Sequence, residues 1–315
     1  MMHILITGIN GFVGSNFTKD WSKNHTLYGL DINQSPKDGV EQIFTWQQLD
    51  SIPQLDAIVH LAGKAHDTKN QSLAQEYFDI NTKLTKKIFD NFLQSQAKTF
   101  VFFSSVKAAA DSVEGDILTE NVIPKPVGPY GESKIKAEEY ILSKSKEQRA
   151  KSKNIYILRP CMIHGPGNKG NLNLLYKVVE KGIPWPLGAF DNRRSFCSVE
   201  NISYVVDQLI SKSDIESGIY HVCDDEPLST NELIQLISGS LERKSRIWKL
   251  PKSLMNALAT MGGILRLPLN KERLKKLTEN YVVSNEKIKR ALNITNMPIT
   301  AAEGMKKTLE SFKIK

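Results

Sequence analysis

The chain has 315 residues, of which 40% are hydrophobic and 24% are charged, and its formal net charge is +8. This composition predicts a soluble globular protein, long enough for one large domain or two modest ones. It excludes a membrane-spanning protein, because no apolar run approaches the roughly 18 residues that would cross a bilayer.

The first predicted strand, His3–Thr7, runs directly into Gly8-Ile-Asn-Gly11-Phe-Val-Gly14 and then into a helix-compatible segment. Glycines at such positions let the backbone turn tightly and approach a pyrophosphate, while the N-terminus of the next helix offers it free N–H groups. The spacing differs from the commoner G-x-G-x-x-G, and an ordinary Gly-rich turn is the alternative. Its place directly after a strand favours a dinucleotide site.

Asp31 follows the second predicted strand, at 26–30, and lies 23 positions after Gly8. An acid about 20 residues beyond this motif can bond the ribose hydroxyls of the cofactor. Since a carboxylate also repels a 2′-phosphate, Asp31 favours NAD over NADP. The alternative interpretation is a turn aspartate.

Strand-like and helix-like patterns alternate through the first half of the chain, which predicts βαβ units and a parallel sheet covered on both faces. After Pro160 the sequence becomes rich in Gly and Pro. We therefore expect a NAD-binding domain at 1–160, to which 193–215 return, and a mainly substrate-binding lobe at 161–315. The predicted strands are 3–7, 26–30, 56–61, 99–104 and 155–159, and the predicted helices are 12–23, 71–95 and 130–147.

Two Tyr-x-x-x-Lys pairs occur, Tyr130/Lys134 and Tyr140/Lys144. Tyr130 lies at a helix start, where its side chain can point into a cleft, whereas Tyr140 lies mid-helix and indicates a surface or packing role. Positions i and i+4 share a helix face, so Lys134 should set its ammonium beside the phenol and lower its pKa. The phenolate could then take a proton from an alcohol while a hydride leaves the same carbon for NAD.

Ser104 and Ser105 follow the apolar run Phe100–Phe103, at the carboxyl edge of the predicted sheet, where open α/β sheets bind ligands. Either hydroxyl could hold a substrate oxygen. Either could also be a helix cap or a turn former.

Together these segments resemble the extended short-chain dehydrogenase/reductases of the NAD-dependent nucleotide-sugar epimerase/dehydratase family, of the UDP-glucose 4-epimerase-like type. The resemblance implies a Rossmann-type doubly wound parallel sheet with a smaller C-terminal α/β substrate lobe. It also implies a homodimer formed through 71–95 and 130–147. The matching segments are Thr7–Gly14, His60–Gly63, Asn81, Phe103–Ser105, Pro129–Lys134, Leu158–Pro160, Arg193–Phe196 and Tyr281–Lys289.

The resemblance also implies roles for single residues. Tyr130 would be the base, Lys134 would lower its pKa and bind the ribose, and Ser105 would hold the substrate hydroxyl. Arg194 would grip the diphosphate of a nucleotide-diphospho-sugar, with a UDP-sugar favoured. The substrate would meet Ser105, Asn171, Leu187, Arg194 and Arg273. NAD would meet Gly8, Gly11, Phe12, Val13, Gly14, Asp31, Leu61, Ala62, Gly63, Asn81, Tyr130, Lys134 and Pro160.

Val106-Lys107 stands where the dehydratases of the family carry an Asp-Glu pair directly after the catalytic hydroxyl residue. This departure argues against 4,6-dehydration. The leading hypothesis is NAD-dependent epimerisation at C4 through a 4-keto intermediate, in surface-polysaccharide sugar biosynthesis. A 4-keto-sugar reductase with the same three residues is the alternative, and a non-catalytic protein that senses NAD or a sugar is less favoured.

The positive charge is concentrated at the end of the chain. Residues 240–315 contain 17 Lys/Arg and 6 Asp/Glu, whereas the remainder contains 25 and 28. This quarter could face anionic headgroups, nucleic acid or a phosphorylated ligand, but solvated helix faces are the favoured interpretation. No RNA-binding signature accompanies it, so we expect no nucleic-acid partner. Residues 249–268 could form an amphipathic helix on a membrane, although packing on the protein itself is favoured.

The cysteines Cys161, Cys197 and Cys223 lie far apart in the sequence and in no metal-ligand spacing. A sparse, odd set of cysteines fits a reducing compartment and implies no structural zinc. The first apolar residues have no basic leader and no cleavage site. These features predict a cytoplasmic protein without a bound metal.

Overall fold

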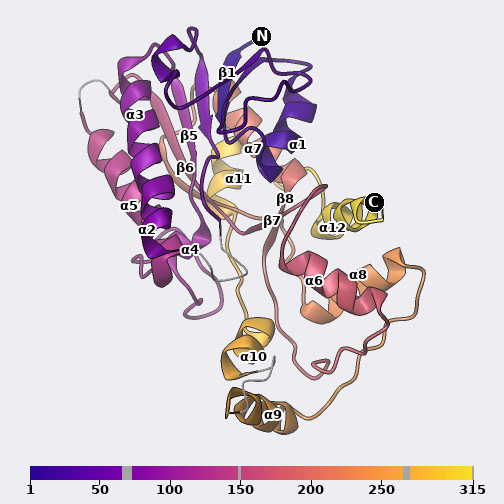
Figure 1. Ribbon diagram of the computed structural model, residues 1–315. Helices are drawn as coiled ribbons and strands as arrows, with labels where there is room; N and C mark the ends of the chain where they lie inside the picture. Colours follow the sequence, from indigo (N-terminus) through magenta and orange to yellow (C-terminus); the bar gives the residue numbers. More distant parts are fainter. Residues whose placement is uncertain (66–72, 148–149, 265–269, 314–315) are drawn as a thin grey trace.

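The computed structural model describes residues 1–65, 73–147, 150–264 and 270–313. Its centre is a sheet of seven parallel strands in the order β3-β2-β1-β4-β5-β6-β9 (Figure 1). The central strands are continuous apolar runs, as expected where helices cover both faces of a parallel sheet. The strands are β1 (His3–Thr7), β2 (Thr26–Leu30), β3 (Gln42–Phe44), β4 (Ala57–His60), β5 (Thr99–Phe103), β6 (Asn154–Pro160) and β9 (Gly218–Val222).

The strand order reverses at β1, which pairs with β2 on one side and with β4 on the other. From this point the chain builds the sheet outward in two directions. Doubly wound sheets bind their ligands at the carboxyl ends of the strands beside such a reversal. The loops after β1 and β4 are therefore the place to look for a site.

Two layers of helices sandwich the sheet, and alternate residues of β1 show this directly. Ile4 and Ile6 belong to one buried cluster and Leu5 to the other. The first cluster lies under α1 (Phe12–Trp21), α7 (Val199–Ser211) and α11 (Glu286–Leu292), and the second under α3 (Leu84–Gln94) and α5 (Gly128–Lys144) (Figure 1).

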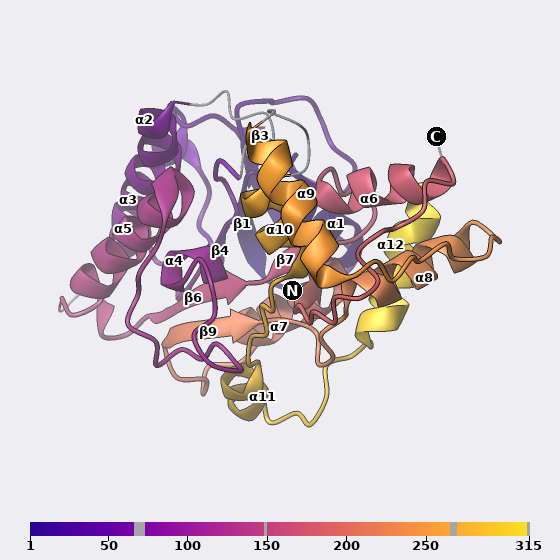
Figure 2. The ribbon, with the colours of Figure 1, turned by 90° about the horizontal axis from the view of Figure 1, so that it is seen from below.

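Most of the elements after β6 form a smaller lobe below the sheet in the view of Figure 1, and this lobe is nearest the viewer in Figure 2. A short parallel pair, β7 and β8, leads into it, and α6, α8 and α12 share one buried cluster. A second cluster joins α9 and α10 to the segment around Trp185 and Leu187. The bounds are β7 (Met162–His164), β8 (Phe196–Ser198), α6 (Asn171–Glu180), α8 (Thr230–Ser240), α9 (Lys252–Ile264), α10 (Lys271–Thr278) and α12 (Ala301–Ser311).

This architecture confirms the predicted fold class. The predicted strands at 3–7 and 26–30 have the observed bounds, the one at 99–104 differs by one residue at its end, and those at 56–61 and 155–159 differ by one residue at both ends. The predicted helix at 71–95 is α2 (Ala74–Tyr77), a π-helical turn η2 (Phe78–Lys83) and α3, while 71–72 lie outside the described residues. Strand β3 and the two-stranded sheet were not predicted, because three-residue strands leave almost no periodicity to detect.

Segments beyond residue 160 return to the large sheet over a wider range than 193–215. Strand β9 takes its edge position, and α11 packs against it. The sequence missed both because neither continues the βαβ alternation of the first half. The domain boundary near 160 stays a prediction.

Within the described ranges, no helix combines the length and the apolar composition that crossing a bilayer requires. Helices α3 and α5 pack side by side on the outside of the sheet (Figure 1). A homodimer through these two helices stays a prediction.

Candidate active site

The glycine loop after β1 brings two backbones into close contact. Gly8 has a φ of +70°, and a Cβ there would lie 2.9 Å from the backbone of Ala62, in the loop after β4. A Cβ on Gly14 would lie 2.7 Å from the carbonyl oxygen of Gly8. Helix α1 follows Gly11 without a side-chain cap, so its first N–H groups are available to an anion. The loop therefore fits a dinucleotide pyrophosphate.

The predicted acid lies beside this loop. Asp31 accepts hydrogen bonds from the backbone N–H groups of Asn10 at 3.0 Å and Asn33 at 3.2 Å. Lys37, which the sequence did not single out, donates from Nζ to the Ile9 carbonyl at 2.6 Å and to Ser15 Oγ at 2.9 Å. Burial lowers the pKa of Lys37 and the Asp31 charge opposes this. Lys37 thus ties the loop after β2 to the glycine loop.

The other predicted cofactor residues lie at the same carboxyl edge. Phe12 and Val13 begin α1, Leu61–Gly63 follow β4, and Pro160 ends β6. Gly63 lies against the predicted catalytic lysine, because a Cβ on it would be 3.0 Å from Lys134 Nζ. A larger residue at this position would displace the ammonium.

A chain of buried hydrogen bonds connects this edge with the helical layer. Ala62 N–H donates to Thr7 Oγ1 at 3.0 Å, and Thr7 Oγ1 lies 2.6 Å from His60 Nδ1. On the other side of the ring, His60 Nε2 lies 2.8 Å from Thr85 Oγ1, which donates to the Asn81 carbonyl at 2.7 Å. All these groups are satisfied when Thr7 donates to Nδ1 and Nε2–H donates to Thr85, which is the neutral imidazole.

Acidification is expected to destabilise the fold through this histidine. Burial lowers the pKa of His60 to about 3, so the unfolded chain, with a His pKa near 6.5, takes up the proton first. This contribution to the free energy of unfolding is complete above about pH 6.5 and decreases towards pH 3, by about 2 kcal/mol at pH 5. Burial also lowers the pKa of His221 to about 3, so His221 acts in the same direction.

Urea unfolding of the wild type and of His60→Gln at pH 7, 6 and 5 measures this effect. The variant should be less stable at pH 7 but should lose less stability on acidification. If the free energy of unfolding fell equally with pH in the two proteins, His60 would not be the group that takes up the proton.

Three predicted catalytic residues meet at the ends of β5 and α5. Ser105 caps the short helix α4 (Val106–Ala109), where its Oγ accepts from Lys107 N–H at 3.2 Å. It is therefore the helix cap that the sequence offered as an alternative, and its hydroxyl also interacts with the Tyr130 phenol. Lys134, one turn beyond Tyr130 on α5, donates from Nζ to the Phe103 carbonyl at 2.7 Å.

Burial shifts the pKa values of Tyr130 and Lys134 towards their neutral forms. Burial raises the pKa of Tyr130, while the hydrogen bond from Ser105 opposes the rise and the neighbouring Tyr77 adds to it. The expectation of a lowered pKa is therefore wrong for these side chains by themselves, because desolvation of the phenolate outweighs its stabilisation. Burial also lowers the pKa of Lys134 to about 8, and the Glu138 carboxylate opposes this.

The π-helical turn η2 positions the neighbouring loop. Its buried Asn81 accepts from Lys64 N–H at 2.7 Å and donates to Ser133 Oγ at 3.0 Å, which links the loop after β4 to α5. Tyr77, just before η2, places its ring edge-on to Tyr130 with centroids 6.4 Å apart. Turns of this kind often occur at functional sites. Tyr77 was missed because no local motif marks it.

A buried charge cluster lies beneath Lys134. Glu138 accepts from Arg159 Nη2 at 2.6 Å and from Arg159 Nε at 3.0 Å, and Ser104 Oγ donates to the same carboxylate. Both charged side chains are at most 2% exposed. Of the two serines, Ser104 therefore belongs to this internal cluster, whereas Ser105 belongs to the site.

The predicted diphosphate residue Arg194 is connected to the site through Tyr281. The backbones of these two residues pair, and Tyr281 Oη donates to the Ala110 carbonyl just after α4 at 2.7 Å. Lys107 Nζ lies 4.6 Å above the Tyr281 ring and 3.0 Å from Asp111 Oδ1. Arg194 Nη1 donates to the Lys276 carbonyl of α10 at 2.5 Å and forms no ion pair with a carboxylate of the described ranges.

The other predicted substrate residues lie in the smaller lobe. Asn171 is exposed at the start of α6, Leu187 is buried in the cluster under α9, and Arg273 lies in the first turn of α10. None of these belongs to the elements that carry Ser105 and Tyr130. Their approach to a common substrate stays a prediction.

The three cysteines, distant in sequence, are brought together. Cys161, Cys197 and Cys223 are all buried, and the Cys161 and Cys223 thiols interact. Burial raises the pKa of Cys161 and of Cys197, so both stay thiols at neutral pH. In the part of the chain that the structure describes, no group of His, Cys, Asp or Glu side chains could hold a metal ion.

Comparison with known proteins extends these observations. The model of the NAD dependent epimerase/dehydratase family matches residues 4–223. The chain is 26% identical over 321 residues to UDP-glucose 4-epimerase of Vibrio cholerae, a match covering 98% of the chain and 95% of that protein. It is also 26% identical over 325 residues to N-acetyl-alpha-D-glucosaminyl-diphospho-ditrans,octacis-undecaprenol 4-epimerase of Escherichia coli O157:H7, covering 98% and 94%.

A reductase and a solved structure are similar as well. GDP-6-deoxy-D-mannose reductase of Pseudomonas aeruginosa is 23% identical over 264 residues, which cover 81% of the chain and 85% of that protein. The structure of MoeE5 in complex with UDP-glucuronic acid and NAD superposes with a TM-score of 0.77 at 17% identity, over 99% of both chains. This last similarity concerns the fold.

Proposed function

The chain belongs to the NAD-dependent epimerase/dehydratase family, and from this premise we propose that it epimerises a nucleotide-diphospho-sugar at C4. One observation carries the proposal. At the carboxyl edge of the sheet the Ser105 hydroxyl interacts with the Tyr130 phenol, and Lys134 donates to the Phe103 carbonyl two residues before Ser105 and lies against Gly63 in the loop after β4. A hydroxyl brought to this pair meets both a proton acceptor and a donor that can hold its oxygen.

In the proposed reaction, Tyr130 takes the proton of the 4-hydroxyl group and Ser105 holds the same oxygen. Lys134, whose pKa lies near 8, remains mostly charged at neutral pH and favours the phenolate. NAD, when bound, supplies the reversible hydride acceptor and the positive charge of its nicotinamide ring. Tyr130 returns the proton after the 4-keto sugar has turned over, so the reaction consumes no cofactor.

The proposal excludes 4,6-dehydration. Elimination of water needs an acid and a base next to the catalytic hydroxyl residue, and Ser105 is followed by Val106 and Lys107. The Lys107 ammonium is held 3.0 Å from Asp111, on the side of Tyr281. It supplies neither the carboxylate nor the carboxylic acid of that reaction.

The proposed substrate carries a diphosphate, and a UDP-sugar is favoured. The names of both epimerase relatives describe a sugar joined to a diphosphate. Arg194 offers a guanidinium without a carboxylate partner in the described ranges, which suits phosphate oxygens. Asp31 beside the glycine loop favours NAD over its phosphorylated form. We place the reaction in the supply of sugars for surface polysaccharides.

A 4-keto-sugar reductase is the second candidate, since the relative from Pseudomonas aeruginosa is a reductase and the same three residues serve both reactions. Incubation with UDP-, GDP- and dTDP-sugars and their 4-keto forms, followed by NMR of the products, separates the two. A product altered only at C4, without net cofactor consumption, is the expected result. Stoichiometric oxidation of NADH or NADPH would identify the reductase, and no change in any sugar would overturn both.

The contact between α4 and α5 yields a further prediction. A Cβ on Gly131, the residue after Tyr130, would lie 2.5 Å from the Lys107 carbonyl oxygen, so Gly131→Ala must push α4 and the preceding Ser105 away from Tyr130. Because a misplacement of about 1 Å can cost a factor of about 100, we expect turnover to fall by about that factor.

Gly239→Ala in α8 is the matched control, since a Cβ there meets nothing within 4 Å. It should leave turnover unchanged and stabilise the helix by about 0.5–1 kcal/mol. Steady-state kinetics and thermal unfolding of both variants measure the difference. Equal turnover in the two variants would show that the α4–α5 contact does not position Ser105.

A further inference from the structure

Helix α9 has two apolar sides, of which the protein covers one. Met255 and Ala259 are buried in the cluster shared with Leu274 of α10. Leu254, Leu258 and Met261, spaced by four and three residues, are 45%, 43% and 54% exposed. Such spacing places them on one stripe of the helix. A helix that only packs on its own protein has no need of this second stripe.

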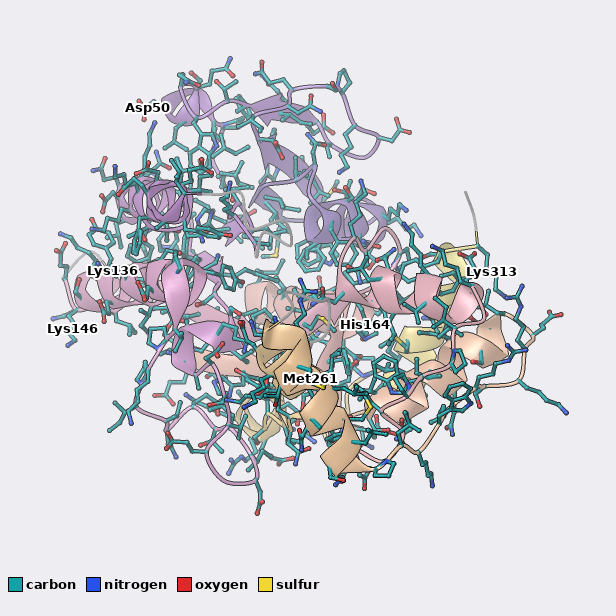
Figure 3. The ribbon with its side chains drawn as sticks, turned by 60° about the horizontal axis from the view of Figure 1, so that its bottom comes forward. Asp50, Lys136, Lys146, His164, Met261 and Lys313 are labelled. Atoms are coloured by element: carbon teal, nitrogen blue, oxygen red, sulfur yellow. The ribbon has the colours of Figure 1, made fainter. Side chains whose placement is uncertain are left out.

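This stripe lies at the edge of the molecule. Figure 1 shows α9 at the bottom, beyond α10, and Figure 2 shows the same helix in front when the molecule is seen from below. Met261 is labelled on this foremost helix in Figure 3. Trp248, just before α9, is 56% exposed, and Leu277 of α10 is 38% exposed. We call these five apolar residues, together with the basic residues of α9 and α10, the α9–α10 face.

The charge around the stripe is strongly positive. Residues 246–261 and 270–280 contain seven Lys/Arg and two Glu. Lys271 and Lys275 line the groove between α9 and α10. One of the two acids, Glu272, is paired with Lys276 at 2.7 Å. Exposed apolar side chains bordered by lysines are typical of helices that lie in the surface of an anionic membrane.

We propose that the α9–α10 face docks on an anionic phospholipid surface, with α9 parallel to the bilayer and its apolar stripe among the headgroups. A second copy of the chain fits this face poorly, because a two-fold contact would set its lysines against the same lysines. Nucleic acid fits poorly too, since three of the five exposed apolar residues are leucines, which cannot stack on bases as aromatic rings do.

Docking of this kind would bring the lipid surface close to the proposed diphosphate-binding residues. Arg194 is bonded to the Lys276 carbonyl of α10, and Leu187 belongs to the buried cluster beneath α9. The inner side of the helix pair therefore supports these residues while its outer side meets the membrane. This inference goes beyond the proposed sugar chemistry and does not depend on it.

Vesicle sedimentation of the full-length protein tests the proposal. The chain should pellet with vesicles of phosphatidylcholine and phosphatidylglycerol, should remain in solution with phosphatidylcholine alone, and should be released by high salt. Leu258→Gln with Met261→Gln keeps the charge and should weaken binding at least tenfold. Lys271→Gln with Lys275→Gln keeps the apolar stripe and should weaken binding to anionic vesicles about fivefold per lysine.

Ile123→Gln is the matched control, because Ile123 is 78% exposed outside the α9–α10 face, and it should bind as the wild type does. Equal NAD binding and thermal unfolding of all variants show that the fold is intact. Absence of binding to anionic vesicles overturns the proposal, as does unchanged binding by the Leu258/Met261 variant. A dimer that dissociates in that variant would assign the face to a second copy instead. The sugar panel above is independent of each outcome.

Discussion

Tyr130→Phe is expected to lower turnover of the sugar substrate by about 1,000-fold, within the range attributed to general acid–base catalysis. The variant keeps the ring and its edge-on packing against Tyr77 but lacks the oxygen that meets Ser105. NAD affinity should change little, because the glycine loop, Asp31 and Lys134 are untouched. Single-turnover kinetics and NAD titration measure the two quantities separately.

Tyr140→Phe is the matched control, since Tyr140 begins the second Tyr-x-x-x-Lys pair. Its hydroxyl donates to Asp90 Oδ1 at 2.6 Å, between α5 and α3, and burial raises its pKa to about 12. Loss of this bond should cost about 1 kcal/mol of stability and no turnover. Wild-type turnover in Tyr130→Phe would contradict the assignment of Tyr130 as the base.

Glu138→Gln is expected to cost about 3–5 kcal/mol of the free energy of unfolding, because it leaves the buried Arg159 charge without its partner. It should also alter the chemistry. The Glu138 carboxylate opposes the fall in the pKa of Lys134, which burial has already brought to about 8. Without that carboxylate the pKa falls further, so the alkaline limb of the kcat/KM profile should move to lower pH.

The controls separate stability from chemistry. Glu139→Gln, one residue further along α5, is exposed and should leave both quantities unchanged. Glu138→Gln with Arg159→Met removes both charges and should recover part of the stability, since apolar replacements of buried ion pairs are often tolerated. The altered pH profile should remain in this double variant. If the pH dependence of kcat/KM matched the wild type in both Glu138 variants, the pair of Glu138 and Arg159 would have a structural role only.

Local pattern was sufficient for five of the seven strands of the sheet and for the turn that follows the first of them. The apolar run of β1, the turn at Gly8 and the start of α1 are consecutive in the chain, and the physical reasons for them act between neighbours. The pairing of Tyr130 with Lys134 is equally local, because four residues make about one helical turn. Asp31 followed from the regular length of one βαβ unit.

The remaining features depend on contacts between residues that only folding brings together. Glu138 meets Arg159 across two elements, Thr7 meets His60 across two strands, and Tyr281 reaches Ala110 from a segment 171 residues away. The direction of the pKa shift of Tyr130 depends on such contacts as well. The i+4 spacing predicted a fall, but the phenol is desolvated by groups that no spacing rule contains.

The α9–α10 face shows the same division in one helix. The sequence alone predicted an amphipathic segment at 249–268 and a basic C-terminal quarter. Residues 265–268 of that segment lie outside the described ranges. Which apolar side is covered was decided by tertiary packing, which buries Met255 and leaves Leu258 exposed. Periodicity records that a helix has an apolar side, whereas burial depends on which neighbour occupies the space beside it.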